Sequence, residues 1–202
     1  MDTGENIKRI AIFASGSGTN AENIIRYFGQ GKPARVALIL TNNKNAYVID
    51  RANKFGVPCK VFNRNTFYHT EEILDFLKEQ AIDLVVLAGF LWLVPENLIR
   101  SFPGRIINIH PALLPKYGGK GMYGHMVHDA VIKSGDPESG ITIHYVNESY
   151  DSGAIIFQAR CAILPGYTAD DLAEKVHELE YKYYPEVIEK VLLDNTRIDV
   201  NK

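Results

Sequence analysis

Short apolar runs alternate with longer segments of helical periodicity along the chain. The apolar runs of strand length lie at residues 8–14, 35–40, 58–62, 83–88 and 105–109. The segments with apolar side chains at helical spacing lie at residues 20–28, 46–55 and 66–80. This alternation is typical of βα units around a mainly parallel sheet. The run at residues 83–88 does not alternate, which predicts a central strand covered on both faces.

The last third of the chain has a different pattern. Residues 141–146 and 154–159 alternate between apolar and polar side chains, which predicts an antiparallel strand pair. Residues 169–193 form one long helical segment, which Pro185 is expected to bend or interrupt. The whole pattern predicts an α/β fold, with a single-domain, Rossmann-like, mainly parallel sheet flanked by helices and ending in an antiparallel strand pair.

The composition indicates one globular domain that acts on small molecules. The chain has 202 residues, of which 46% are hydrophobic and 23% are charged, so residues 1–202 are expected to form a single domain with its own core. The formal net charge of -2 creates no basic field. We therefore expect small-molecule substrates and no nucleic-acid or membrane partner.

The cysteines and the N-terminus indicate a reducing compartment. Cys59 and Cys161 lie far apart, with no Cys or His nearby at metal-ligand spacing, so neither a disulfide framework nor a metal site is expected. The N-terminus is polar and acidic, and the first apolar run is too short for a signal peptide. No stretch is long and apolar enough to span a membrane. A cytoplasmic location follows as the expectation.

A glycine-rich turn, residues 15–20, follows the first predicted strand and opens the first helix. Its backbone N–H groups and the helix N-terminus would form an anion site suited to a phosphate. A dinucleotide motif is incomplete because Ala21 replaces its third glycine, and the P-loop lysine is absent. The alternative is a tight structural turn with Thr19 or Asn20 as the N-cap. The position of the glycine-rich turn at the carboxyl edge of the sheet favours a ligand site.

Three polar residues lie near strand ends in the second half. Asn108 and His110 are two residues apart, so both side chains would project to one side at the carboxyl edge of the sheet. An amide N–H and a protonated imidazole there would suit an oxyanion that develops on an attacked carbonyl. Asp151 adds a carboxylate that would raise the pKa of His110. Each residue also has a purely structural interpretation. Asn108 and Asp151 could be turn residues, and His110 could be a buried histidine with satisfied hydrogen bonds.

Four segments together resemble one enzyme family. They are residues 14–20 (ASGSGTN), 87–90 (LAGF), 107–115 (INIHPALLP) and 151–153 (DSG). In this order they are similar to the phosphoribosylglycinamide formyltransferases, and the resemblance covers residues 7–192. It implies transfer of a formyl group from 10-formyltetrahydrofolate, the co-substrate, to the amine of 5-phosphoribosylglycinamide in purine biosynthesis, with no metal. Asn108, His110 and Asp151 would be the catalytic residues.

The resemblance also implies binding residues. The phosphoribosylglycinamide ligands would be Gly18, Thr19, Asn20 and Glu180. The formylfolate ligands would be Arg64, Leu91, Trp92, Leu93, Val94 and Asn108. Residues 7–100 would then form a phosphate-binding half and residues 101–193 a folate and catalytic half. Without the resemblance, Glu180 would be interpreted as a solvated helix residue.

The chain departs from the family pattern at three places. Trp92 stands where relatives often carry a basic residue, and His177 stands where some carry lysine, so His177 is not assigned as a ligand. The glycine-rich loop at residues 116–125, including Gly118 to Gly124, is longer than in many relatives. It either closes over substrate or is mobile.

The implied reaction is a direct transfer. The amine of the ribonucleotide would attack the formyl carbon, and Asn108 and His110 would stabilise the oxyanion. His110 would begin protonated, with Asp151 favouring that charge. The sequence leaves open whether the chain is a monomer or a homodimer.

Three other functions are compatible with parts of this pattern. A formyltetrahydrofolate deformylase would use the same residues with water, but such proteins usually add an N-terminal regulatory domain. Methionyl-tRNA formyltransferases add a C-terminal nucleic-acid-binding domain. Here the first strand begins within the first ten residues and the last helix ends near Leu193. A non-catalytic phosphometabolite-binding module would need the glycine turn alone.

Overall fold

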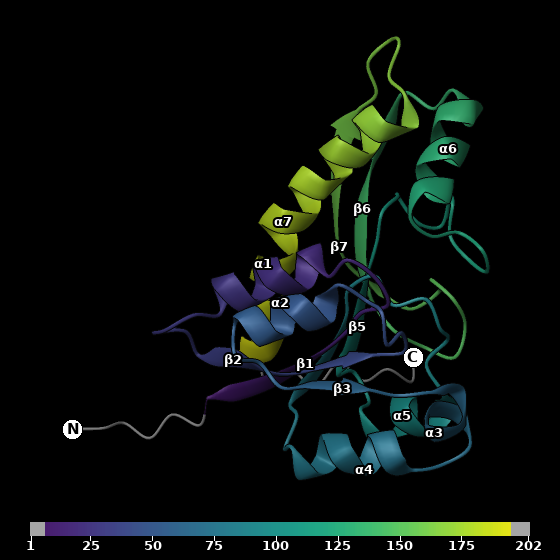
Figure 1. Ribbon diagram of the computed structural model, residues 1–202. Helices are drawn as coiled ribbons and strands as arrows, with labels where there is room; N and C mark the ends of the chain where they lie inside the picture. The colour runs from purple at the N-terminus through teal and green to yellow at the C-terminus, as the bar shows by residue number, and fades with distance from the viewer. Residues whose placement is uncertain (1–6, 195–202) are drawn as a thin grey trace.

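In residues 7–194, which the computed structural model describes, seven strands form one mixed sheet (Figure 1). The strands lie in the order β3-β2-β1-β4-β5-β6-β7. Their bounds are Lys8–Phe13 (β1), Ala34–Thr41 (β2), Cys59–Val61 (β3), Leu84–Leu87 (β4), Ile106–His110 (β5), Glu138–Tyr145 (β6) and Ile155–Ala162 (β7). Strands β1 to β5 pair in parallel, whereas β5–β6 and β6–β7 are antiparallel. The predicted fold class is confirmed.

Helices cover both faces of the sheet (Figure 1). Their bounds are Thr19–Tyr27 (α1), Val48–Lys54 (α2), Arg64–Tyr68 (α3), Glu72–Glu79 (α4), Glu96–Ser101 (α5), His125–Ser134 (α6) and Ala169–Leu193 (α7). One hydrophobic cluster joins α1, α2, α6 and α7 to one face, and the other joins α3, α4 and α5 to the opposite face. The sequence pattern did not predict α5 and α6.

Side-chain alternation along the strands explains the two clusters. In β1, Ile10 and Ile12 belong to one cluster, while Ala11 and Phe13 belong to the other, and none is more than 2% exposed. All four residues of β4 are buried, and β4 is the middle strand in the spatial order of the sheet. The predicted central strand is therefore confirmed, because only a strand covered on both faces is buried at every position.

The single helix predicted at residues 66–80 was wrong, because the chain forms two helices there. The first helix, α3, begins earlier than predicted, since Asn63 and Thr66 form a reciprocal capping box. The chain leaves the helix at His69, and the Thr70 hydroxyl accepts a hydrogen bond from the backbone N–H of Glu72. This bond satisfies one of the free N–H groups at the start of α4.

The predicted interruption at Pro185 was also wrong. Helix α7 is continuous over 25 residues with Pro185 inside it. A proline cannot donate to the carbonyl four residues earlier, which here belongs to Tyr181. The side-chain amide of Asn23, on α1, donates to this carbonyl at 2.8 Å. A side chain from another helix thus replaces the missing backbone bond.

Candidate active site

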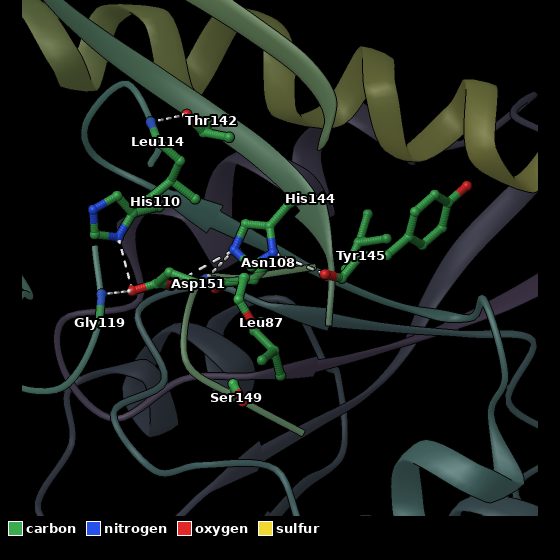
Figure 2. A network of polar contacts seen from close by, with 12 residues as sticks. Leu87, Asn108, His110, Leu114, Gly119, Thr142, His144, Tyr145, Ser149 and Asp151 are labelled. Carbon is green, nitrogen blue, oxygen red and sulfur yellow. Dashed lines mark hydrogen bonds and ion pairs between the residues drawn. The ribbon is translucent and has the colours of Figure 1, made fainter. Parts of the chain in front are cut away.

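A cavity of about 720 Å³ opens at the carboxyl ends of the parallel strands. Its walls come from the glycine turn, the segment after β4, the end of β5, the loop before α6, the loop between β6 and β7, and one face of α7. Segments far apart in sequence meet here because parallel strands present their carboxyl ends at one edge. Figure 2 shows the polar contacts on one side of this cavity.

Asn108 lies on β5 directly opposite His144 on β6. Its amide nitrogen is 3.1 Å from Nε2 of His144 and 3.4 Å from Oδ1 of Asp151 (Figure 2). Nδ1 of His144 lies 2.8 Å from the carbonyl oxygen of Tyr145. A carbonyl only accepts, so Nδ1 carries a proton, and Nε2 faces both the Asn108 amide and Oδ1 of Asp151, which is 3.6 Å away. Binding a substrate oxygen would require the amide to give up its longer contact with Asp151.

His110, at the end of β5, is only 3% exposed. Its Nε2 is 2.7 Å from the Tyr117 carbonyl and therefore carries a proton, while Nδ1 is 3.5 Å from Oδ2 of Asp151. Burial lowers the pKa of His110, and this outweighs the opposing effects of Asp151 and the Tyr117 carbonyl. The expectation of a raised pKa was therefore wrong for the free protein, because desolvation was not visible in the sequence.

Asp151 reaches His110, Asn108 and His144 from the loop between β6 and β7 (Figure 2). Its backbone is in the left-handed region, with φ of 51°, and its Oδ2 accepts from Gly119 N at 2.9 Å. Burial by itself raises the pKa of Asp151. The His144 contact, the electrostatic effect of His110 and the Gly119 N–H together lower it by more, so the pKa of Asp151 is below its ordinary value. The carboxylate thus stays ionised between two histidines.

The glycine-rich loop forms a wall of the site. Tyr117 and Gly119 contact His110 and Asp151 through their backbone. A Cβ on Gly118 would lie 2.5 Å from the Leu114 side chain and 3.2 Å from Cβ of Asp151. The loop therefore packs closely onto Asp151, and a side chain at Gly118 would displace Leu114 and crowd Asp151.

The glycine turn lines the same cavity. Gly18 is the N-cap of α1, with φ of 72° and no side-chain cap, so the predicted cap at Thr19 or Asn20 was wrong. A Cβ at Gly18 would lie 2.4 Å from the Val48 side chain. Gly18, Thr19 and Asn20 all line the cavity, at the N-terminus of α1. This arrangement is an anion-binding geometry.

Glu180 on α7 joins the glycine turn to α7. It is 5% exposed, and its Oε2 accepts from the Asn20 amide at 2.9 Å and lies 2.8 Å from Nδ1 of His177. The interpretation of Glu180 as a solvated helix residue was therefore wrong. The carboxylate raises the pKa of His177, which also lines the cavity.

The remaining predicted residues lie on the side of the cavity toward α3. The Leu91–Val94 segment lines the cavity, and the Leu91 backbone N–H donates to the Ser15 hydroxyl at 3.0 Å. Arg64 does not line the cavity, and its guanidinium carbon lies 5.0 Å from the Trp92 ring centroid. Arg64 thus contacts a residue of the cavity wall without lining the cavity itself.

Two buried histidines of the cavity wall, His128 and His144, were missed in the sequence. The available signal for His144 was its place in an alternating strand, but its register against Asn108 comes from the fold. His128 on α6 is 3% exposed, its Nδ1 has no hydrogen-bond partner, and burial lowers its pKa to about 4. A histidine between Val127 and Val131 on a buried helix face was the available signal.

No three His, Cys, Asp or Glu side chains in residues 7–194 are grouped to hold a metal ion. No helix within that range is long and apolar enough to cross a membrane.

Known proteins share this sequence and this fold. A sequence model of the formyl transferase family matches residues 8–188. The phosphoribosylglycinamide formyltransferase of Haemophilus influenzae is 40% identical over 187 residues, covering 90% of this chain and 86% of that protein. The one from Bacillus subtilis is 35% identical over 196 residues, covering 95% and 98%. A chloroplastic relative in Arabidopsis thaliana is 41% identical over 90% of this chain, which spans 64% of that relative's length.

Solved structures agree. The phosphoribosylglycinamide formyltransferase from Bacillus halodurans has a TM-score of 0.83 at 38% identity, covering 93% of this chain and 96% of that chain. Glycinamide ribonucleotide transformylase 1 from Geobacillus kaustophilus has a TM-score of 0.84 at 39% identity, covering 93% and 100%. From family match, relatives and fold together, the chain belongs to the formyl transferase family and, within it, to the phosphoribosylglycinamide formyltransferases.

Proposed function

We propose that the chain transfers the formyl group of 10-formyltetrahydrofolate to the amine of 5-phosphoribosylglycinamide, in the de novo synthesis of purines. The observation that carries this proposal is the convergence of Asn108, His110 and Asp151 on one cavity that the glycine turn also lines. The first group suits acyl transfer, and the second suits a phosphorylated acceptor. We place the enzyme in the cytoplasm, as a monomer or homodimer.

The chemistry follows from the donors and their protonation. As the amine attacks the formyl carbon, the carbonyl oxygen becomes an oxyanion, which Asn108 and protonated His110 would stabilise by donating hydrogen bonds. For this, Asn108 would give up its 3.4 Å contact with Asp151, and Nδ1 of His110 its 3.5 Å contact with the same carboxylate. The negative charge of the oxyanion adds to the charge of Asp151 and favours protonated His110, although burial keeps the ring neutral beforehand. The new C–N bond to the amine forms, and the bond between the formyl carbon and folate N10 breaks. The amine loses one proton and N10 gains one, so no net proton is released.

The two substrates would occupy different walls. Gly18, Thr19 and Asn20 would bind the phosphate of the ribonucleotide through the helix N-terminus, and Glu180 would bind its sugar side. The pterin of the folate would lie along Leu91, Trp92, Leu93 and Val94, near Asn108. Arg64 would act on the folate from the rim. The division into a phosphate-binding half (7–100) and a folate and catalytic half (101–193) is part of the proposal.

One assay tests the function against its rivals. Folate absorbance is followed with the purified enzyme, with and without 5-phosphoribosylglycinamide. We expect turnover only when the amine is present. Folate turnover without the amine would instead indicate a hydrolase, and ligand binding without any turnover would indicate a binding module.

A further inference from the structure

Tyr117 combines an unfavourable backbone conformation with a close contact to His110. Its φ is 56°, in the left-handed region that residues with a Cβ rarely adopt. Among the non-glycine residues of the described range, 7–194, a positive φ occurs only at Ala81, Tyr117 and Asp151. Two of these three residues contact His110, one at each ring nitrogen. Such a conformation persists only where surrounding contacts enforce it, so other contacts hold Tyr117 in place.

The Tyr117 side chain is anchored near the turn between α6 and β6. Its hydroxyl oxygen lies 2.8 Å from Oδ2 of Asp136 and 2.6 Å from Oγ of Ser134. A carboxylate can only accept, so the hydroxyl donates to Asp136. Lys116 pairs with the same carboxylate at 3.0 Å, and the hydrogen bonds from Tyr117 and Lys116 lower the pKa of Asp136 below its ordinary value. An ionised carboxylate before β6 therefore holds the first residues of the glycine-rich loop.

The two ring nitrogens of His110 face competing acceptors. Nε2 lies 2.7 Å from the Tyr117 carbonyl oxygen, whereas Nδ1 lies 3.5 Å from Oδ2 of Asp151 (Figure 2). A neutral imidazole has one proton, so only one of these contacts can be a hydrogen bond. At equal distance the carboxylate would be the stronger acceptor, so the proton lies on Nε2 because the Tyr117 carbonyl is held closer. Nδ1 is then left free to take up a proton when the oxyanion forms.

We propose that Tyr117 is a positioning residue for His110. The bond from its hydroxyl to Asp136 keeps the Tyr117 carbonyl on Nε2 of His110, and this selects Nδ1 as the nitrogen that exchanges a proton during the reaction. Tyr117 does not line the active-site cavity, so it acts through His110. The consequence for turnover rests on the proposed function, whereas the consequence for the ring of His110 in the free protein does not.

The first test measures which ring nitrogen of His110 carries the proton in the free protein. Wild type and Tyr117→Phe are labelled with ¹⁵N-histidine, and His110→Gln identifies the His110 signals among those of the six histidines. At pH 8, above the pKa of His110, the wild type should show a protonated Nε2 and an unprotonated Nδ1. In Tyr117→Phe both nitrogen shifts should move toward those of the Nδ1–H tautomer, because Asp151 then competes with a carbonyl that is no longer held. Wild-type shifts in Tyr117→Phe would overturn the inference.

The second test is a kinetic double-mutant cycle of Tyr117 and Asp136. Tyr117→Phe and Asp136→Ala should each lower kcat about ten- to 100-fold and change KM for 5-phosphoribosylglycinamide by less than about twofold, because only the His110 ring loses its position. The double variant should be no slower than either single variant, since both remove the same bond. Asp136→Asn keeps an acceptor for the hydroxyl and should recover most of the rate. Wild-type kcat in Tyr117→Phe, or fully additive losses in the double variant, would contradict the inference.

Two control variants separate this role from a general loss of stability. Tyr27→Phe removes a hydroxyl bond to another carboxylate, that of Glu189, between α1 and α7. Lys116→Gln removes the cation beside Asp136 and leaves the Tyr117 bond in place. Neither variant should change the His110 signals or kcat, and an equal loss of kcat in Tyr27→Phe and Tyr117→Phe would show that the inference is wrong. If the wild type transfers no formyl group, the proposed function fails, and the ring signals of His110 still decide whether Tyr117 positions it.

Discussion

Nε2 of His144 lies 3.1 Å from the side-chain amide nitrogen of Asn108, which lies directly opposite it on the neighbouring strand. The Tyr145 carbonyl holds the other ring nitrogen, Nδ1, at 2.8 Å. The contact with His144, together with the Asp151 contact, determines how the Asn108 amide is oriented in the cavity. His144 therefore belongs to the site although it is not among the catalytic candidates.

Replacing His144 with phenylalanine should misorient Asn108. The ring shape is kept and the polar contact with the Asn108 amide is removed, so we expect kcat to fall about 100-fold with little change in KM for the ribonucleotide. Steady-state kinetics with both substrates measures this. An equal rise in both KM values with normal kcat would contradict an orienting role.

The variants His110→Ala and Asp151→Asn should each reduce kcat by about two to four orders of magnitude. Ribonucleotide binding should survive, because its predicted ligands are on the glycine turn and α7. Single-turnover rates and calorimetric affinities separate the two effects. Wild-type turnover in either variant would refute the catalytic assignment.

Gly18→Val should weaken the ribonucleotide far more than the folate. The new side chain would collide with Val48 and would require φ of 72°, which disfavours a β-branched residue. We expect at least a tenfold rise in KM for the ribonucleotide and less than a twofold change for the folate, a rough estimate for a displaced phosphate site. Gly31→Val, at an open position with φ of 83°, is the control for backbone strain alone. Equal losses for both substrates would argue against a phosphate site.

Acid should destabilise the protein through His128. Its pKa is about 4 in the folded protein and about 6.5 when unfolded, so below pH 6.5 the unfolded state binds more protons. Stability is therefore lost as the pH falls from about 7 toward 4, by about 2 kcal/mol at pH 5 from this residue. Urea unfolding of His128→Gln at pH 7 and pH 5 should show a smaller difference than the wild type. His69→Gln, which removes an exposed histidine, is the matched control.

Asn23→Ala should destabilise α7 at Pro185. The Tyr181 carbonyl would lose its donor, at a cost of about 1 kcal/mol in the free energy of unfolding. In a Pro185→Ala background the backbone can supply the bond again, so the same Asn23 substitution should cost less. Thermal unfolding of the wild type, the two single variants and the double variant measures the coupling between Asn23 and Pro185. Strictly additive losses of stability would show that the Asn23 side chain does not replace the missing backbone donor.

Local patterns in the sequence determined the strands, most helices and the fold class, because apolar periodicity and glycine turns act over a few residues. Residues 169–193 were predicted with the correct bounds. The family motifs also identified Asn108, His110, Asp151 and the glycine turn. The pairing of α1 with α7 through Asn23 and Tyr181, which keeps the helix intact at Pro185, lies beyond any local pattern.

Only the tertiary structure decided the electrostatics and the supporting contacts. Burial, which depends on the whole fold, lowers the pKa of His110 where proximity to Asp151 alone predicted the opposite. Glu180 is buried and accepts a hydrogen bond from Asn20, 160 residues away in the sequence. His144 meets Asn108 only through the register of two antiparallel strands. Desolvation and long-range contacts depend on residues that are distant in the sequence and that only the fold brings together. No single stretch of sequence can therefore predict them.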